Sequence, residues 1–166
     1  MNLGFTGIAF KFGDNINTDY IISSRRKRDT LDMNVLKQYL MEDIRPGFFS
    51  ELREKNVMVG GENFGCGSAM EVAAQVVKEN NFGAVLAKSF SRSYYRNCIN
   101  NGLLVIQADT DFIDEGDEIM ISMDADKIII RDSTKGIEVS VDPYPENIKS
   151  IIHAGGIMND LEGFMG

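Results

Sequence analysis

The stretch VMVGGENFGCGSAMEVAAQVVKENNFGAVLAKSFSRSYYRNCINNGLLVI, residues 57–106, decides the fold. Short apolar runs alternate in it with segments of helical spacing, an order that is typical of parallel crossover units. We therefore predict parallel strands with a ligand site at their carboxyl ends, where loops turn into helices. The apolar runs are 57–59, 84–87 and 103–106, and the helical segments are 69–80 and 94–100.

A glycine-rich loop joins the first apolar run to the first helical segment. Residues 60–68 hold four glycines, which let backbone approach a ligand closely and expose N–H groups. Ser68 ends this loop, and Glu71 follows at the spacing of a capping box. A helix N-terminus also favours anions such as carboxylates. We predict that Ser68 is the N-cap of the helix and is displayed at an anion site.

Weaker patterns flank this central stretch. Alternating and apolar runs predict strands before and after it, and helical spacing predicts further helices. The predicted strands are 6–12, 118–123, 127–131 and 136–141, and the predicted helices are 31–40, 48–52, 146–153 and 157–164.

Composition limits the class of protein. The chain has 166 residues, is 43% hydrophobic and 25% charged, and carries a net charge of −8. These values suit one globular domain spanning residues 1–166. General binding to nucleic acid or to a membrane surface needs a basic footprint that an acidic chain lacks. Residues 1–15 do not resemble a signal peptide, and no apolar run has the length of a transmembrane helix. We expect a cytoplasmic protein.

Cysteine and histidine content limits the metal chemistry. Cys66 and Cys98 are the two cysteines and His153 is the single histidine, which is too few ligands for a zinc or iron–sulfur site. We predict two buried, inert thiols and a His153 that serves as a helix cap or surface residue. The glycine loop is neither G-x-G-x-x-G nor a P-loop with its lysine, so a nucleotide site is disfavoured.

Several motifs stand out in order along the chain. They are NTDYII at 17–22, GENFGCGSAME at 61–71, AKSFSR at 87–92 and YRNCINNGL at 95–103. These motifs resemble the small subunits of the isopropylmalate dehydratase family, which correspond to the swivel domain of aconitase. The resemblance spans nearly the whole chain and implies an α/β fold, a swivelling β/β/α domain with a mixed sheet and flanking helices.

The resemblance also implies a function. The chain would be the small subunit of a hydro-lyase that acts on a small 2-hydroxy dicarboxylic acid, with a 4Fe-4S cluster on a partner large subunit. 3-Isopropylmalate, in leucine biosynthesis, is the expected substrate, and 2,3-dimethylmalate, citramalate and homoaconitate-type acids are alternatives. Ser68, as an alkoxide, would abstract a proton, and Asp19 would belong to the acid–base network. The residues alone instead favour a side chain that braces the turn at Asp19.

The chain departs from the family's pattern at the proposed site. The family reads Gly-Ser-Ser-Arg-Glu where this chain has GSAME at 67–71, so Met70 stands in place of an arginine that grips a substrate carboxylate. Either the substrate presents an apolar group towards Met70, or another basic residue binds the carboxylate in place of the missing arginine. Loss of the chemistry, leaving a binding module with the same fold, is a further alternative. Gly67, Ala69 and Met70 remain expected substrate contacts.

The basic run SSRRKRD at 23–29 is the second departure. A charge run by itself indicates solvated surface. In the family, the segment after Ile22 is a flexible loop that reaches over the substrate, and Arg28 is the best match to its substrate-binding arginine. A basic residue from Arg25 to Arg28 is expected to replace the missing arginine if the substrate is charged there. Arg25 and Arg26 are further candidates for substrate binding, because a guanidinium binds a carboxylate through two hydrogen bonds.

Overall fold

The computed structural model describes residues 3–124 and 126–154. Within them, seven strands form one mixed sheet in the order β4-β3-β2-β1-β5-β6-β7. The pairs from β1 to β4 are parallel, and the pairs from β1 through β5 and β6 to β7 are antiparallel. The strands are β1 (Leu3–Lys11), β2 (Asn56–Val59), β3 (Phe82–Ala87), β4 (Leu104–Gln107), β5 (Glu118–Met123), β6 (Ile128–Asp132) and β7 (Ile137–Val141).

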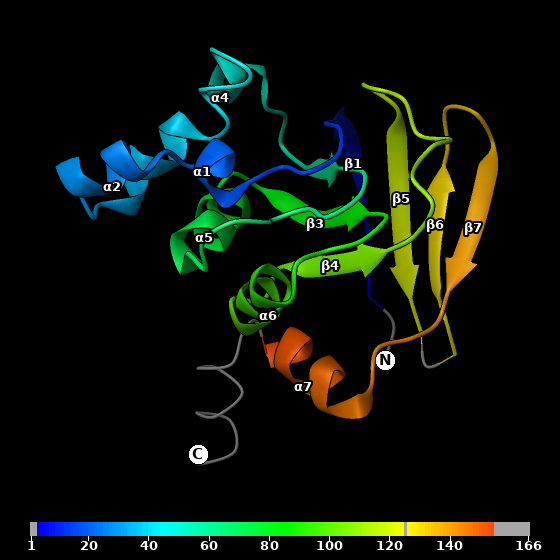
Figure 1. Ribbon diagram of the computed structural model, residues 1–166. Coiled ribbons are helices and arrows are strands. Elements are labelled where there is room, and N and C mark those ends of the chain that lie inside the picture. The colour runs from blue at the N-terminus through cyan, green and yellow to red at the C-terminus, as the bar shows by residue number, and fades with distance from the viewer. Residues whose placement is uncertain (1–2, 125, 155–166) are drawn as a thin grey trace.

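Strand β1 joins the two halves of the sheet. Its residues 3–8 pair with β5 on one edge, and its residues 8–11 pair with β2 on the opposite edge, so the two pairings follow one another along the strand. The sheet bends there, and Figure 1 shows the antiparallel strands as one layer, the parallel strands as a second and the helices as a third. The predicted β/β/α arrangement with a mixed sheet is confirmed.

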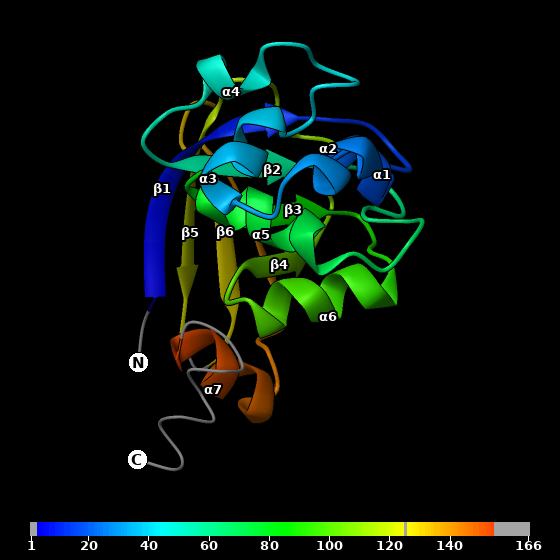
Figure 2. The same cartoon turned by 90° about the vertical axis from the view of Figure 1, so that its left-hand side faces the viewer.

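Helices α5 and α6 cover the parallel strands, as Figure 2 shows. The face of α5 that meets the sheet is apolar, and Ala73, Val76 and Val77 on it are fully buried. The short helices α1 to α3 lie on the α5 side of the molecule, and α1 lies nearest the end of the sheet where the site is expected. The helices are α1 (Thr18–Ile21), α2 (Ser24–Asp29), α3 (Met33–Leu36), the 3-10 helix η1 (Lys37–Tyr39), α4 (Phe48–Glu51), α5 (Glu71–Glu79), α6 (Arg92–Asn100) and α7 (Glu146–Ala154).

Two predicted elements differ in the structure. The helix predicted over 31–40 is replaced by α3 and η1, which follow the N-cap Asp32. The segment 24–29, expected as a loop, is the helix α2, and the Asp19 carboxylate accepts the backbone N–H of its first residue, Ser24. The helix predicted over 157–164 lies outside the described residues. No helix in the described part of the chain is both long and apolar enough to cross a membrane.

Candidate active site

Three loops meet at the carboxyl ends of the parallel strands. They are 12–17 after β1, 60–70 after β2 and 88–91 after β3. Gly65 N donates to Ile16 O at 2.7 Å, and Phe64 N donates to Ser89 O at 3.0 Å. The loop after β2, which we call the glycine loop (60–70), is therefore held on both sides by backbone hydrogen bonds. All three loops carry motifs that the sequence singled out.

Two glycines of this loop are required by close contacts. Gly65 has φ +81°, and a Cβ there would lie 2.2 Å from Cγ of the buried Tyr94. Gly67 has φ +94°, and its Cβ would lie 2.7 Å from the side-chain oxygen of Asn17. Only glycine combines this backbone conformation with so little space. The pattern Gly-Cys-Gly therefore serves to bring the loop against the turn after β1 and against α6.

Ser68 is not the N-cap of α5, so the predicted capping box is wrong. The helix begins at Glu71, its N-cap is Met70, and the Met70 side chain makes no capping hydrogen bond. The backbone of Met70 is extended, with φ −123° and ψ 108°, so the helix cannot begin as early as Ser68. The carbonyl of Ser68 accepts a hydrogen bond of 2.8 Å from the hydroxyl of Thr18. This contact across the loops holds Ser68 outside the helix.

The Ser68 hydroxyl is available for chemistry. Ser68 and its neighbours Gly67 and Ala69 are exposed. Within the described residues, the Ser68 hydroxyl makes no hydrogen bond, and the backbone N–H groups of Gly67, Ser68 and Ala69 donate to no acceptor. Unpaired N–H groups before a helix can bind an anion. The predicted display of Ser68 beside anion-binding donors thus has a geometric basis, although the predicted cap does not.

Met70 differs from its neighbours in the loop. Its side chain is 8% exposed and belongs to the hydrophobic core. A substrate contact by Met70 stays a prediction, and it would require this side chain to leave the core. An arginine in the same orientation would bury a charge, which is costly without a partner. The Met70 side chain is thus accommodated by the core of this protein.

Asp19 is exposed on α1, directly after the turn that holds the glycine loop. One carboxylate oxygen accepts hydrogen bonds from Ser24 Oγ at 2.7 Å and from Ser24 N at 2.9 Å. These bonds, with the positive charges of Lys27 and Arg25, hold the pKa of the Asp19 carboxyl below its usual value. Asp19 is therefore ionised and braces the start of α2, as the residues alone indicated.

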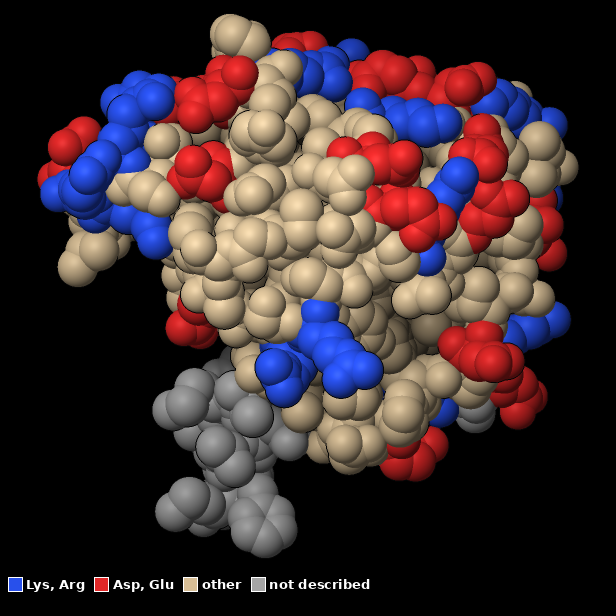
Figure 3. All heavy atoms as spheres, in the orientation of Figure 1, with Lys and Arg blue, Asp and Glu red and all other residues tan. Residues whose placement is uncertain are grey.

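The basic side chains of α2 fall into two groups. Arg26 Nε lies 2.7 Å from Glu42, and its guanidinium stacks 3.8 Å above the centre of the Tyr39 ring. Arg25 pairs with Glu42 at 3.3 Å and with Asp43 at 3.1 Å. Arg28 has no ion pair within the described residues. Figure 3 shows basic side chains gathered over α2, so positive charge projects from this helix.

Two serines after β3 support the glycine loop and were missed by the sequence reasoning. Ser89 Oγ accepts from Asn63 N and donates to the Glu62 carboxylate, both at 2.7 Å. Ser91 Oγ donates to Gly65 O at 2.8 Å and caps α6. Both lie in the motif AKSFSR at 87–92, which was recognised without a role for its hydroxyl groups.

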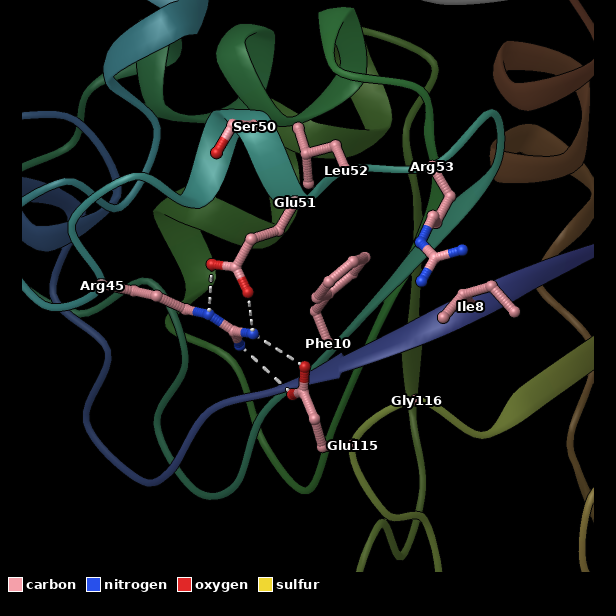
Figure 4. A pocket seen from close by; sticks show the side chains of 9 residues that line it. All are labelled: Ile8, Phe10, Arg45, Ser50, Glu51, Leu52, Arg53, Glu115 and Gly116. Atoms are coloured by element: carbon pink, nitrogen blue, oxygen red, sulfur yellow. Dashed lines mark hydrogen bonds and ion pairs between the residues drawn. The ribbon is translucent and has the colours of Figure 1, made fainter.

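A separate cavity of about 460 Å³ lies between β1, the α4 segment and the turn before β5. Figure 4 shows Arg45 between two carboxylates, Glu51 at 2.8 Å and Glu115 at 2.9 Å. Hydrogen bonds to Glu51 and then to Glu115 raise the pKa of Arg45. The guanidinium also lies 5.0 Å from the centre of the Phe48 ring. The positive charge of Arg45 is therefore balanced by two carboxylates of the protein. We interpret these ion pairs as a structural link between the α4 segment and the turn before β5.

The described residues do not fit a metal centre. They hold no group of three or more His, Cys, Asp or Glu side chains placed to bind a metal ion. Cys66 lies in the glycine loop and is partly exposed, whereas Cys98 is fully buried in α6. The prediction of a buried thiol is thus confirmed for Cys98 and wrong for Cys66, which lies in a loop where the next three residues are exposed. His153 is exposed in the last turn of α7, as predicted.

Comparison with known proteins places this geometry in a family. The family model described as the aconitase C-terminal domain matches residues 27–111. The 3-isopropylmalate dehydratase small subunit of Caldanaerobacter subterraneus is 44% identical over 155 residues, which cover 92% of this chain and 94% of that protein. The methanogen homoaconitase small subunit of Methanothermobacter thermautotrophicus is 41% identical over 153 residues, 92% of this chain and 88% of that protein.

A solved structure agrees with the family match and with the two relatives. The crystal structure of 3-isopropylmalate dehydratase from Methanocaldococcus jannaschii superposes with a TM-score of 0.88 at 37% identity, and the match covers 98% of this chain and 96% of that one. The resemblance found in the sequence and the predicted swivel-domain fold are thereby confirmed. The chain belongs to the aconitase C-terminal domain family, in the group of the 3-isopropylmalate dehydratase and homoaconitase small subunits.

Proposed function

We propose that this chain is the small subunit of a cytoplasmic hydro-lyase that moves water across adjacent carbons of a small 2-hydroxy dicarboxylic acid. The observation that carries the proposal is the exposed Ser68 hydroxyl, free of protein partners within the described residues and adjacent to unpaired backbone N–H groups. The names of the relatives support 3-isopropylmalate, the substrate of leucine biosynthesis, as the acid. A homoaconitate-type acid is the second candidate, favoured by the 41% identical homoaconitase small subunit.

In this proposal Ser68 takes the proton from the carbon next to the one that bears the hydroxyl. An ordinary serine is far too weak a base, so its alkoxide must be stabilised where it forms. The N–H groups of Gly67 and Ala69 flank it and can donate either to that alkoxide or to a substrate carboxylate. Asp19, which is ionised and lies beside α2, would supply a negative charge to the acid–base network of the site.

We propose that Arg28 binds a substrate carboxylate. It is exposed on α2 and has no ion pair within the described residues. Arg25 and Arg26 were also expected to bind substrate, but their guanidinium groups already contact Glu42 and Asp43. They would reach the substrate only by breaking these ion pairs. We therefore assign the contact to Arg28 and a supporting role to the other two arginines.

We further propose that a partner large subunit carries the 4Fe-4S cluster. The described residues of this chain lack the ligands for one, since Cys66 and Cys98 lie in separate environments and no suitable group surrounds either. The small-subunit names of the relatives support a partner of this kind. Only proton transfer and carboxylate binding are therefore assigned to this chain.

The test is a turnover assay with the partner present. The chain would be produced with the large subunit from the same organism, purified without oxygen, and supplied with isopropylmalate, dimethylmalate, citramalate and homocitrate. Ser68→Ala should lower kcat about a hundredfold or more on the preferred acid, as loss of a general base does. Ser50→Ala is the matched control, because Ser50 is an exposed serine on α4 whose hydroxyl donates to the nearby Gly47 O. Normal turnover by Ser68→Ala would refute the role of Ser68.

Arg28 is tested in the same assay. Arg28→Ala should raise KM about tenfold to a hundredfold, because a charge-assisted hydrogen bond is lost. Arg25→Ala, on the same helix with its guanidinium paired to acidic residues, should change KM little. A larger effect at Arg25 than at Arg28 would reverse the assignment. A stable complex that turns over none of the acids would favour the reading as a binding module.

A further inference from the structure

Thr18 makes the one hydrogen bond that reaches Ser68 within the described residues. Its hydroxyl donates to Ser68 O at 2.8 Å, and its backbone N–H donates to Cys66 O at 2.8 Å. The two bonds reach the glycine loop on either side of Gly67. Thr18 is 1% exposed, so its hydroxyl has little access to water as an alternative partner. The contact joins positions 50 residues apart in the sequence.

The segment that carries Thr18 is fixed to the core. Ile21 and Ile22, which follow on α1, are fully buried. Asn17 Oδ1 accepts from Asp19 N at 2.8 Å and also lies against Gly67. One short turn therefore holds the glycine loop and presents the Asp19 carboxylate. Its position sets where Ser68 lies relative to Asp19.

The hydroxyl of Thr18 also polarises the peptide unit between Ser68 and Ala69. Ser68 C=O and Ala69 N–H belong to the same peptide unit. A donor to the carbonyl oxygen polarises that unit and makes its N–H a stronger donor, as in hydrogen-bond chains. Ala69 N–H is one of the donors left unpaired beside the Ser68 hydroxyl within the described residues.

We propose that Thr18 is a positioning residue that places the Ser68 hydroxyl and strengthens the Ala69 N–H beside it. The inference rests on the proposed role of Ser68 as the base. A base must lie within hydrogen-bond reach of the proton it takes, and small displacements reduce the rate steeply. Thr18 itself touches neither the substrate nor the transferred proton in this scheme.

The test compares threonine variants of the complete chain in complex with its large subunit. Thr18→Val keeps the shape and removes the hydroxyl, and Thr18→Ser keeps the hydroxyl. Thr110→Val is the matched control: Thr110 is 2% exposed, and its hydroxyl donates to Gly60 O, at the far end of the same loop, at 2.7 Å. We expect Thr18→Val to lower kcat about tenfold with KM changed less than about twofold, as loss of one positioning hydrogen bond implies. Thr18→Ser should restore most of kcat, and Thr110→Val should retain it.

Hydrogen exchange of the isolated chain tests the geometry independently of turnover. Protection of the Gly65 and Ala73 amides, which donate to Ile16 O and Met70 O on either side of Ser68, should fall in Thr18→Val and persist in Thr18→Ser. Unchanged protection in Thr18→Val, equal losses of kcat in Thr18→Val and Thr110→Val, or no rescue by serine would each overturn the inference. Full activity of Thr18→Val while Ser68→Ala is inactive would overturn it and leave the proposed function intact. Full activity of Ser68→Ala would instead refute the proposed function.

Discussion

Asp19 and Ser24 are joined by two hydrogen bonds to a single carboxylate oxygen, from the hydroxyl at 2.7 Å and from the backbone N–H at 2.9 Å. The pair spans the junction between α1 and α2 and links the carboxylate of the candidate site to the basic helix. Because these bonds favour the charged form, they lower the pKa of the Asp19 carboxyl.

Ser24→Ala should therefore raise the pKa of Asp19 towards its ordinary value. A carboxyl whose folded pKa is lowered contributes stability above its unfolded pKa and loses it as the pH falls through the folded pKa. The variant should show a smaller loss of stability in that acidic window than the unmodified protein. Carboxyl-carbon NMR titration of Asp19 measures the pKa. Ser23→Ala is the control, since Ser23 makes no side-chain cap bond; an equal shift there would show a general loosening of α2.

The parallel half of the sheet could be predicted from the sequence because its signals are local, whereas the mixed β/β/α arrangement was expected from the family resemblance. The apolar runs of β2, β3 and β4 and the spacing of α5 and α6 lie within one continuous stretch, 57–106. The glycine loop between β2 and α5 was also predictable, since its glycines mark a close backbone approach. Local patterns of this kind need no knowledge of distant contacts.

The details of the site depend on contacts between distant residues, so the sequence could not supply them. The S-x-x-E spacing at 68–71 predicts a cap, yet Thr18, 50 residues earlier, holds Ser68 outside the helix. Arg26 looked free to bind substrate, but it pairs with Glu42, 16 residues later. Met70 was expected at the substrate, and its burial followed only from the packing of the loop.

Gly65→Ala should destabilise the protein by about 3 kcal/mol or more, from backbone strain together with overpacking. The added Cβ would lie 2.2 Å from Tyr94, a ring that is 1% exposed and cannot move aside. Urea denaturation gives the free energy of unfolding.

Gly116→Ala separates the two causes. Gly116 has φ +86°, close to that of Gly65, but a Cβ there meets nothing within 4 Å. It should cost only about 1 kcal/mol, the strain of a positive φ. Similar values for the two variants would contradict the steric account and leave backbone conformation as the sole cause.

Asp132→Asn should stabilise the protein at neutral pH by about 1 kcal/mol, the typical net value of a hydrogen bond. Asp132 is fully buried, and its Oδ2 has no partner in the described structure. Burial, and then the neighbouring carboxyl group of Asp117, raise the pKa of Asp132. A raised folded pKa gives stability at low pH that is lost as the pH rises through that pKa. An amide nitrogen at this position would donate to Asp117 at every pH.

The gain from Asp132→Asn should therefore grow as the pH rises. Lys135 also faces the pair, through its backbone N–H to Asp132 and its amine, 3.3 Å from Asp117. The amide oxygen of the variant can still accept that N–H. Asp124→Asn is the opposite case, since backbone hydrogen bonds from Asp126 and Lys127 lower its pKa, so it should lose stability at neutral pH. Melting curves across the pH range measure both; an Asp132→Asn gain that is constant with pH would rule out the titration of Asp132 as its cause.

Cys66 should react with iodoacetamide in the folded protein, whereas Cys98 should react only after unfolding. The thiolate is the reactive form, and burial raises the pKa of the Cys98 thiol in α6. Cys66 is partly exposed, two residues before Ser68. Intact mass followed by peptide mapping identifies the modified residue, and Cys66→Ser should remain unmodified until denaturant is added. Equal labelling of the two cysteines in the folded chain would show that the core around α6 opens on the timescale of the reaction, against the tight packing of Tyr94 and Cys98.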